Sequence, residues 1–236
     1  MATIRRIVAA ALLAAPSLSL AADMDEMHED TTFHMIRLDT DIGDSNDGSV
    51  ATWDLDGWIG GDTEKLWLRS EGEVVGGETE EAEAWAMYSR NIATYWDAQV
   101  GVRYDWEPVS TAYLVAGFEG LAPYWFETQA HLFLSDEGDL SARIREENDL
   151  LLTQRLIAQP YAEIDLYAQD VPEQEVGAGL SSAQFGLQTR YEITRKFAPY
   201  IDISYERKFG ETGRLAEADD ESKDEFIGAV GLRLMF

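Results

Sequence analysis

Apolar and polar residues alternate with a period of two along most of this 236-residue chain. In residues 224–236, Phe226 and Leu234 fall on one side, whereas Arg233 and Met235 fall on the other. Successive side chains of a β-strand point to opposite faces, so this period predicts strands and not helices. The chain is therefore predicted to be all-β.

The alternating segments are long, and each is bounded by acidic, glycine-bearing or proline-bearing breaks. The same alternation of apolar and polar positions recurs in residues 96–105, 124–134, 140–147, 162–169 and 197–209. About ten residues exceeds the usual five or six of a globular strand and matches a tilted membrane-spanning strand.

A soluble antiparallel sandwich would give the same alternation, with its apolar side turned to a core. Two further features favour a membrane barrel. Aromatic residues gather at segment ends, as at Tyr95, Trp96, Tyr104 and Trp106, where interfacial girdles would lie. The chain also stops on Phe236 directly after an alternating segment, which is typical of bacterial outer-membrane barrels. We predict an antiparallel transmembrane β-barrel of about 10–12 strands.

The N-terminus has the pattern of a secretory signal peptide. Arg5 and Arg6 precede an apolar run, residues 7–15, and small residues follow at 19–22. The run is far shorter than the roughly 20 residues needed to span a bilayer. We expect a signal peptide at 1–22, a mobile acidic leader at 23–33 and a barrel at 34–236, in the outer membrane of a Gram-negative bacterium with the N-terminal segment periplasmic.

Charge and cysteine content exclude several classes of function. Asp and Glu number 45 against 18 Lys and Arg, giving a net charge of −27. Such a polyanion would be repelled by phosphate backbones, so nucleic acid is not an expected partner, whereas outer-membrane lipid is. The absence of cysteine excludes disulfides, thiolate metal sites and a cysteine nucleophile.

Methionine and histidine gather near the start of the predicted mature chain. The candidate metal ligands there are Met24, Met27, His28, His34 and Met35. Thioether sulfur together with imidazole suits copper among the physiological metals. The alternative is an acidic leader in which these residues are incidental.

Strand phase places a second group of candidate ligands on the inner face of the predicted barrel: Met87, His131 and Met235. Glu81, Glu83, Glu127, Glu163 and Asp165 fall on the same face. Interior charges of this kind are also what any water-filled lumen contains. Inward aromatic residues, for which we expect Trp67, Trp125, Phe133 and Tyr167, would fill or plug that lumen.

Two other functions remain open on these residues. One is a general cation-selective or small-solute channel without specific copper sites. The other is a barrel hydrolase built around His131, which would need a nucleophile held by an oriented base. No GxSxG, HExxH, GxGxxG or P-loop spacing occurs, and we expect no enzyme.

The sequence resembles copper resistance protein B, the outer-membrane component of bacterial copper-resistance systems, over nearly all of the predicted mature chain. The resemblance lies in residues 58–62, 66–73, 88–90, 99–105, 117–127, 150–156, 197–200 and 205–210. It implies an outer-membrane barrel that binds copper ions and takes part in copper tolerance, with a periplasmic multicopper oxidase as a partner.

The short leader departs from the extended Met and His repeats of many relatives. From the resemblance and the residues together we expect copper to be captured by the leader. The acidic interior would help by raising the local cation concentration.

Overall fold

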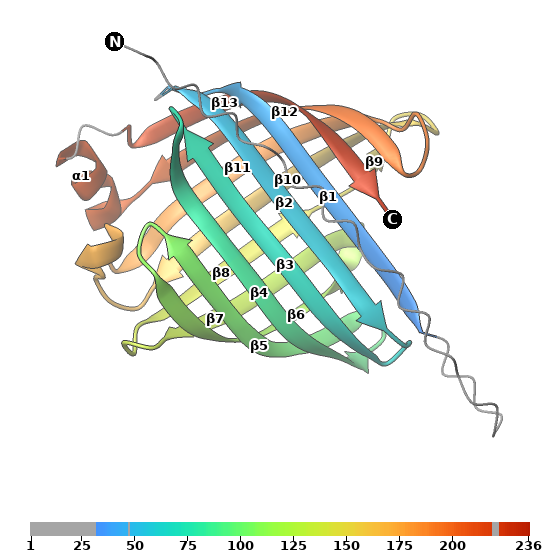
Figure 1. Ribbon diagram of the computed structural model, residues 1–236, viewed down its shortest axis with the longest axis horizontal. Helices are drawn as coiled ribbons and strands as arrows, with labels where there is room; N and C mark the ends of the chain where they lie inside the picture. The colour runs from blue at the N-terminus through green and yellow to red at the C-terminus, as the bar shows by residue number, and fades with distance from the viewer. Residues whose placement is uncertain (1–31, 47, 219–221) are drawn as a thin grey trace, which may run out of the picture. The chain divides into compact units, whose positions relative to one another are not determined.

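The computed structural model describes residues 32–46, 48–218 and 222–236. The expected signal peptide and the candidate ligands Met24, Met27 and His28 lie outside these residues. Within the described residues, twelve long antiparallel strands close into a barrel (Figure 1). The predicted all-β barrel of 10–12 strands is confirmed.

The long strands are β1 (Phe33–Asp44), β2 (Ser49–Gly60), β3 (Glu64–Val75), β4 (Glu78–Ala93), β5 (Trp96–Glu107), β6 (Thr111–Ala122), β7 (Phe126–Ser135), β8 (Leu140–Glu147), β10 (Leu156–Tyr167), β11 (Gly179–Tyr191), β12 (Phe197–Lys208) and β13 (Asp224–Met235). A two-residue strand, β9 (Leu150–Leu151), lies beside β10. Three short helices complete the described elements: η1 (Pro123–Trp125), η2 (Pro172–Gln174) and α1 (Gly210–Ala218). None of the helices in the described residues is long and apolar enough to cross a membrane.

Each long strand pairs with its neighbours in the chain, and the first and last strands close the ring. β8 pairs with β10, β10 pairs with β11, and β13 pairs with β1, with Asp39 opposite Arg233 and Arg37 opposite Met235. Every long strand therefore has a partner on both sides, which leaves no sheet edge open to lipid.

The two faces of the barrel wall reverse the arrangement of a soluble protein. On β5, Val100 and Val102 are more than half exposed on the outside, whereas Gln99 and Asp105 are buried inside. The same holds for Ile201 and Asp202 on β12, and for similar neighbours around the ring. A soluble sandwich would bury its apolar face. The exposed apolar face therefore favours a membrane barrel over a soluble sandwich.

The barrel has two unlike ends. The terminal end carries Phe33 and Met235 and the connections 61–63, 94–95, 123–125, 148–155 and 192–196. The opposite, loop end carries the two longest connections, 168–178 with η2 and 209–223 with α1. The candidate site opens toward this loop end.

Candidate functional site

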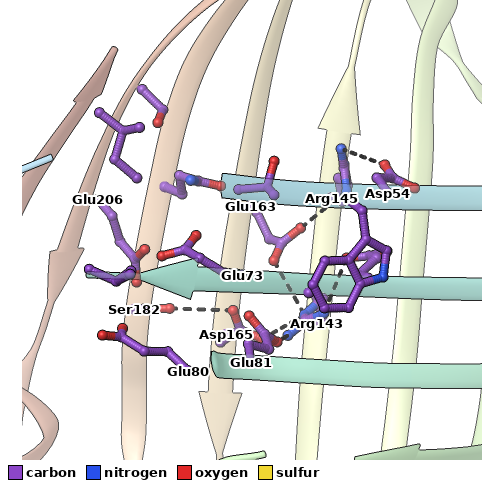
Figure 2. A pocket seen from close by; sticks show the side chains of 18 of the residues that line it. Asp54, Glu73, Glu80, Glu81, Arg143, Arg145, Glu163, Asp165, Ser182 and Glu206 are labelled. Carbon is purple, nitrogen blue, oxygen red and sulfur yellow. Dashed lines mark hydrogen bonds and ion pairs between the residues drawn. The ribbon is translucent and has the colours of Figure 1, made fainter. Parts of the chain in front are cut away.

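A cavity of about 710 Å³ occupies the lumen on the side of β1–β4, β8 and β10–β13 (Figure 2). It reaches from connections at the loop end, represented by Pro108, Glu175 and Thr212, down to Arg37 and Asp54. Fifteen Asp and Glu residues line it against five Arg and Lys residues. Most of this charge comes from inward positions of alternating strands, so the period of two puts the acids into the lumen. The cavity is therefore strongly electronegative.

Arg143 on β8 lies at the centre of the largest group of ion pairs in the cavity. Its Nε lies 3.0 Å from Asp165 Oδ1 and 3.3 Å from Glu163 Oε1, both on the adjacent strand β10. Its Nη1 lies 3.3 Å from Glu83 Oε1 on β4, and 4.0 Å from Glu71 Oε2 on β3. Since β8 does not pair with β3 or β4, these contacts cross the lumen.

Arg37 and Arg145 make a second set of crossing contacts. Arg37 Nη1 on β1 lies 3.9 Å from Glu147 Oε1 on β8, and Arg145 Nη2 on β8 lies 3.9 Å from Asp54 Oδ2 on β2. Arg37 Nη2 lies 3.6 Å from the same Asp54 oxygen. These separations exceed hydrogen-bond length, so these pairs interact through charge alone. Together with Arg143, these ion pairs form a charged layer across the lumen.

An aromatic cluster lies along the wall formed by β3 to β7. It consists of Trp67, Trp85, Met87, Tyr113, Val115 and Phe133, with Trp58 packed against it. Two arginines stack on it: the guanidinium of Arg103 lies 5.0–5.5 Å from the ring centres of Trp85, Tyr113 and Phe133, and Arg69 lies 5.2 Å from that of Trp67. The cluster narrows the lumen, so the open space is confined to the acidic side.

Glu73 and Glu206 differ from the other carboxylates of the cavity because they are half-buried and still lack a direct partner among the described residues, although Lys208 lies within electrostatic range of Glu206. Glu73 on β3 and Glu206 on β12 form no ion pair or hydrogen bond with any of these residues, and Figure 2 draws both without an interaction. Glu73 also lies within electrostatic range of Glu206, Glu225 and Asp41. This group of carboxylates without direct ion pairs is the part of the cavity best suited to attract a cation.

The structure separates the two described candidate ligands at the start of the barrel. His34 and Met35 are both in β1, where His34 is exposed on the outside and Met35 points inward, opposite Trp58 of β2. Successive side chains of a strand cannot converge on one ion, because they leave opposite faces.

Met87, His131 and Met235 are all on the inner face, as strand phase indicates. Met87 is fully buried in the aromatic cluster, and Met235 lies opposite Arg37. His131 Nε2 lies 2.7 Å from Gln99 Oε1, and the Gln99 amide donates to Glu119 Oε2 at 2.8 Å. The Gln99 oxygen is thus the acceptor and His131 Nε2 the donor, so that nitrogen presents no lone pair to a metal in this arrangement.

Two expectations about the lumen need correction or extension. Trp125 was expected inside, but it lies in η1 at the terminal end and is 70% exposed. Residue 125 belongs to a turn, where the alternation of the adjoining strand no longer sets direction. The cross-lumen contacts of Arg37, Arg143 and Arg145 were not predicted. The alternation in the sequence indicates only that these side chains point inward, and not which residues they meet.

No group of three or more His, Cys, Asp or Glu side chains is arranged to hold a metal ion anywhere in residues 32–46, 48–218 and 222–236. The cavity lining also contains no Met or His. Its lining offers many oxygen ligands spread over a cavity of about 710 Å³, which suits a hydrated hard or borderline cation better than Cu(I).

The closed wall, the apolar exterior and the charged lumen together define a porin-like outer-membrane β-barrel. The profile described as "Copper resistance protein B precursor (CopB)" matches residues 32–236. The chain belongs to the copper resistance protein B family.

Two curated relatives agree with this assignment. The chain is 43% identical over 194 residues to the copper resistance protein B homolog of Pseudomonas syringae pv. tomato, covering 82% of this chain and 66% of that protein. It is 38% identical over 212 residues to copper resistance protein B of Escherichia coli, covering 89% of this chain and 72% of that protein.

Solved structures of similar fold are porins of low sequence identity. The NanC porin aligns with a TM-score of 0.59 at 12% identity, over 84% of this chain and 98% of that chain. The KdgM porin aligns with a TM-score of 0.54 at 9% identity, over 86% of this chain and 99% of that chain. At these identities the likeness concerns the fold alone.

Proposed function

We propose that this barrel gathers copper ions at the outer membrane and binds them as part of a copper resistance system. The observation that carries the proposal is the acidic cavity inside a barrel of the copper resistance protein B family. A low-dielectric wall around carboxylates of one sign focuses their field and raises the local concentration of cations.

Within this proposal, the cavity and the leader have different tasks. The cavity holds hydrated Cu(II) mainly by charge, with Glu73 and Glu206 as its first contacts, because these two half-buried carboxylates form no direct ion pair among the described residues. Met24, Met27 and His28 of the leader, with His34 or Met35, supply the softer ligands that discriminate for copper.

Copper titration of the purified full-length protein, by calorimetry and by metal analysis after gel filtration, tests both tasks. We expect Glu73→Gln with Glu206→Gln to weaken Cu(II) binding on the order of tenfold, about 1.4 kcal/mol. The matched control, Asp136→Asn with Glu137→Gln, removes two acids from an exposed turn outside the cavity and should leave binding unchanged.

The second part of the test is a variant that lacks residues 23–31 of the leader. This deletion leaves β1 intact because the strand begins at Phe33. We expect the deletion to reduce the preference for copper over zinc while retaining the weaker binding in the cavity. Copper binding that survives unchanged in both the cavity variant and the deletion would contradict the proposal.

We also propose that the chain binds and does not catalyse. The His131 imidazole is held by Gln99 and packs edge-on against Trp85, with ring centres 5.3 Å apart, a setting for a structural histidine. A phospholipid-hydrolysing activity that disappears in His131→Ala would overturn this part. Hand-over of copper to a periplasmic multicopper oxidase is a further part of the proposal; co-purification of the two proteins would test it.

A further inference from the structure

Three neighbouring turns at the terminal end carry an exposed surface that the copper proposal does not use. Leu150, Leu151 and Leu152 in the connection after β8 are 49%, 68% and 60% exposed, and Ile193 in the connection after β11 is 48% exposed. Arg155, Arg195 and Lys196 lie in the same two connections and are also exposed. We call these seven residues the rim patch.

Hydrogen bonds join the turns into one continuous surface. The backbone N–H of Glu192 donates to the carbonyl oxygen of Arg155 at 2.8 Å, which ties the β11–β12 turn to the turn before β10. The Asn148 side chain donates to the Tyr124 carbonyl at 2.9 Å, which adds η1 with its exposed Tyr124 and Trp125. In Figure 1 the β9 connection and the β11–β12 turn lie side by side.

The charge of the rim patch is opposite to that of the whole chain. Within the described residues, the side chains of Arg155, Arg195 and Lys196 form no ion pair. The acids nearby are Asp149, which is paired with Arg190, Glu192, which is half-buried, and Glu127, which is exposed beside η1 and lies within electrostatic range of Asp149. In a chain with a net charge of −27, a local excess of unpaired basic residues beside exposed leucines indicates a partner that is anionic and apolar at once.

The position of the rim patch identifies that partner as lipid. Outer-membrane barrels have short periplasmic turns and longer extracellular loops, so the terminal end faces the periplasm. The patch continues the lipid-facing wall, where Ile144 and Ile201 are exposed on β8 and β12. We propose that the rim patch binds anionic phospholipid of the periplasmic leaflet, with its leucines among the acyl chains and its basic residues on the headgroup phosphate.

Native mass spectrometry of the full-length protein with phosphatidylglycerol and phosphatidylcholine tests the headgroup contact. In the variant Arg155→Gln with Arg195→Gln and Lys196→Gln, the preference for phosphatidylglycerol over phosphatidylcholine should fall roughly fivefold for each charge removed. The matched control, Arg207→Gln with Arg214→Gln and Lys223→Gln, removes three charges at the loop end and should keep the preference. Equal losses in both variants would overturn the proposal.

A second measurement tests the apolar contact without depending on those variants. The chain has no cysteine, so Leu151→Cys and the control Glu137→Cys each give one site for a spin label. In phosphatidylglycerol-containing vesicles we expect the label at 151 to be accessible to oxygen and shielded from a water-soluble nickel complex, and the label at 137 to show the reverse. A label at 151 that is as exposed to water as that at 137 would assign the patch to a soluble protein partner instead and overturn the lipid proposal.

Discussion

At the scale of single residues, close packing inside this barrel depends on glycines that face large aromatic side chains. The Tyr200 ring passes over Gly231 on the neighbouring strand, and its hydroxyl donates to Asp41 Oδ2 at 2.9 Å on the next strand along. A Cβ added at Gly231 would lie 2.3 Å from Tyr200 Cζ. Tyr161 crosses Gly186 in the same way to donate to Asp202.

Gly231→Ala should therefore destabilise the barrel by about 1–3 kcal/mol, because the tyrosine must leave its position over the glycine. Gly228 on the same strand has open space around the position of a Cβ, so Gly228→Ala is the matched control and should cost little. Denaturant unfolding in phospholipid vesicles, followed by tryptophan fluorescence, measures both. Equal stability of the two variants would refute this account of the packing.

At the scale of elements, the seam between β1 and β13 joins the two ends of the chain and is held by a buried ion pair. Arg233 Nη2 lies 2.6 Å from Asp39 Oδ2, and Arg233 Nε lies 2.8 Å from Asp39 Oδ1. The two residues face each other in the strand register, and each is less than a tenth exposed. A bidentate, desolvated pair at this place fixes the register of β13 against β1.

Arg233→Met should lower the unfolding free energy by about 3–5 kcal/mol, since it leaves a buried carboxylate without its main partner. The double variant Asp39→Leu with Arg233→Met should cost less than the sum of the two single changes. A double-mutant cycle on unfolding in vesicles gives the coupling free energy. If the stability losses of the two single variants add up to the loss of the double variant, there is no coupling free energy between Asp39 and Arg233, and this account of the seam is wrong.

At the scale of the whole molecule, the lumen is divided into an open acidic cavity and a charged layer. The arginines of β8 cross to β2, β3 and β4, while Arg69 of β3 reaches Glu119 and Gln129 of β6 and β7 at 2.6 and 2.9 Å. Ions that moved through the barrel would have to pass this layer, where guanidinium groups compete with them for the carboxylates. The alternative of a cation channel thus depends on these arginines.

Arg143→Gln with Arg145→Gln should increase cation conductance in planar bilayers several-fold, because the variant removes two crossing positive charges and leaves the carboxylates. Arg207→Gln with Arg214→Gln, at the loop end outside the cavity, is the control of equal charge. If wild type, variant and control conduct equally, the layer does not limit passage.

The sequence by itself determined the kind of wall that this chain builds. Alternation assigned Asp202 and His131 to the inside and Ile201 and Leu132 to the outside, and the structure confirms all four. This was possible because side-chain direction in a strand is a local property with a fixed period. The same rule fails at Trp125, where the strand has ended.

Only the tertiary structure decided which inward residues meet. Glu83 and Arg143 are 60 positions apart and come together because the sheet closes, and closure depends on strand number and stagger, which no single segment encodes. For the same reason Glu73 and Glu206, which form no direct ion pair among the described residues, could not be told from the ion-paired acids in the sequence. The sequence determines how many charged side chains point into the lumen. How the barrel closes determines which of these carboxylates form ion pairs and which do not.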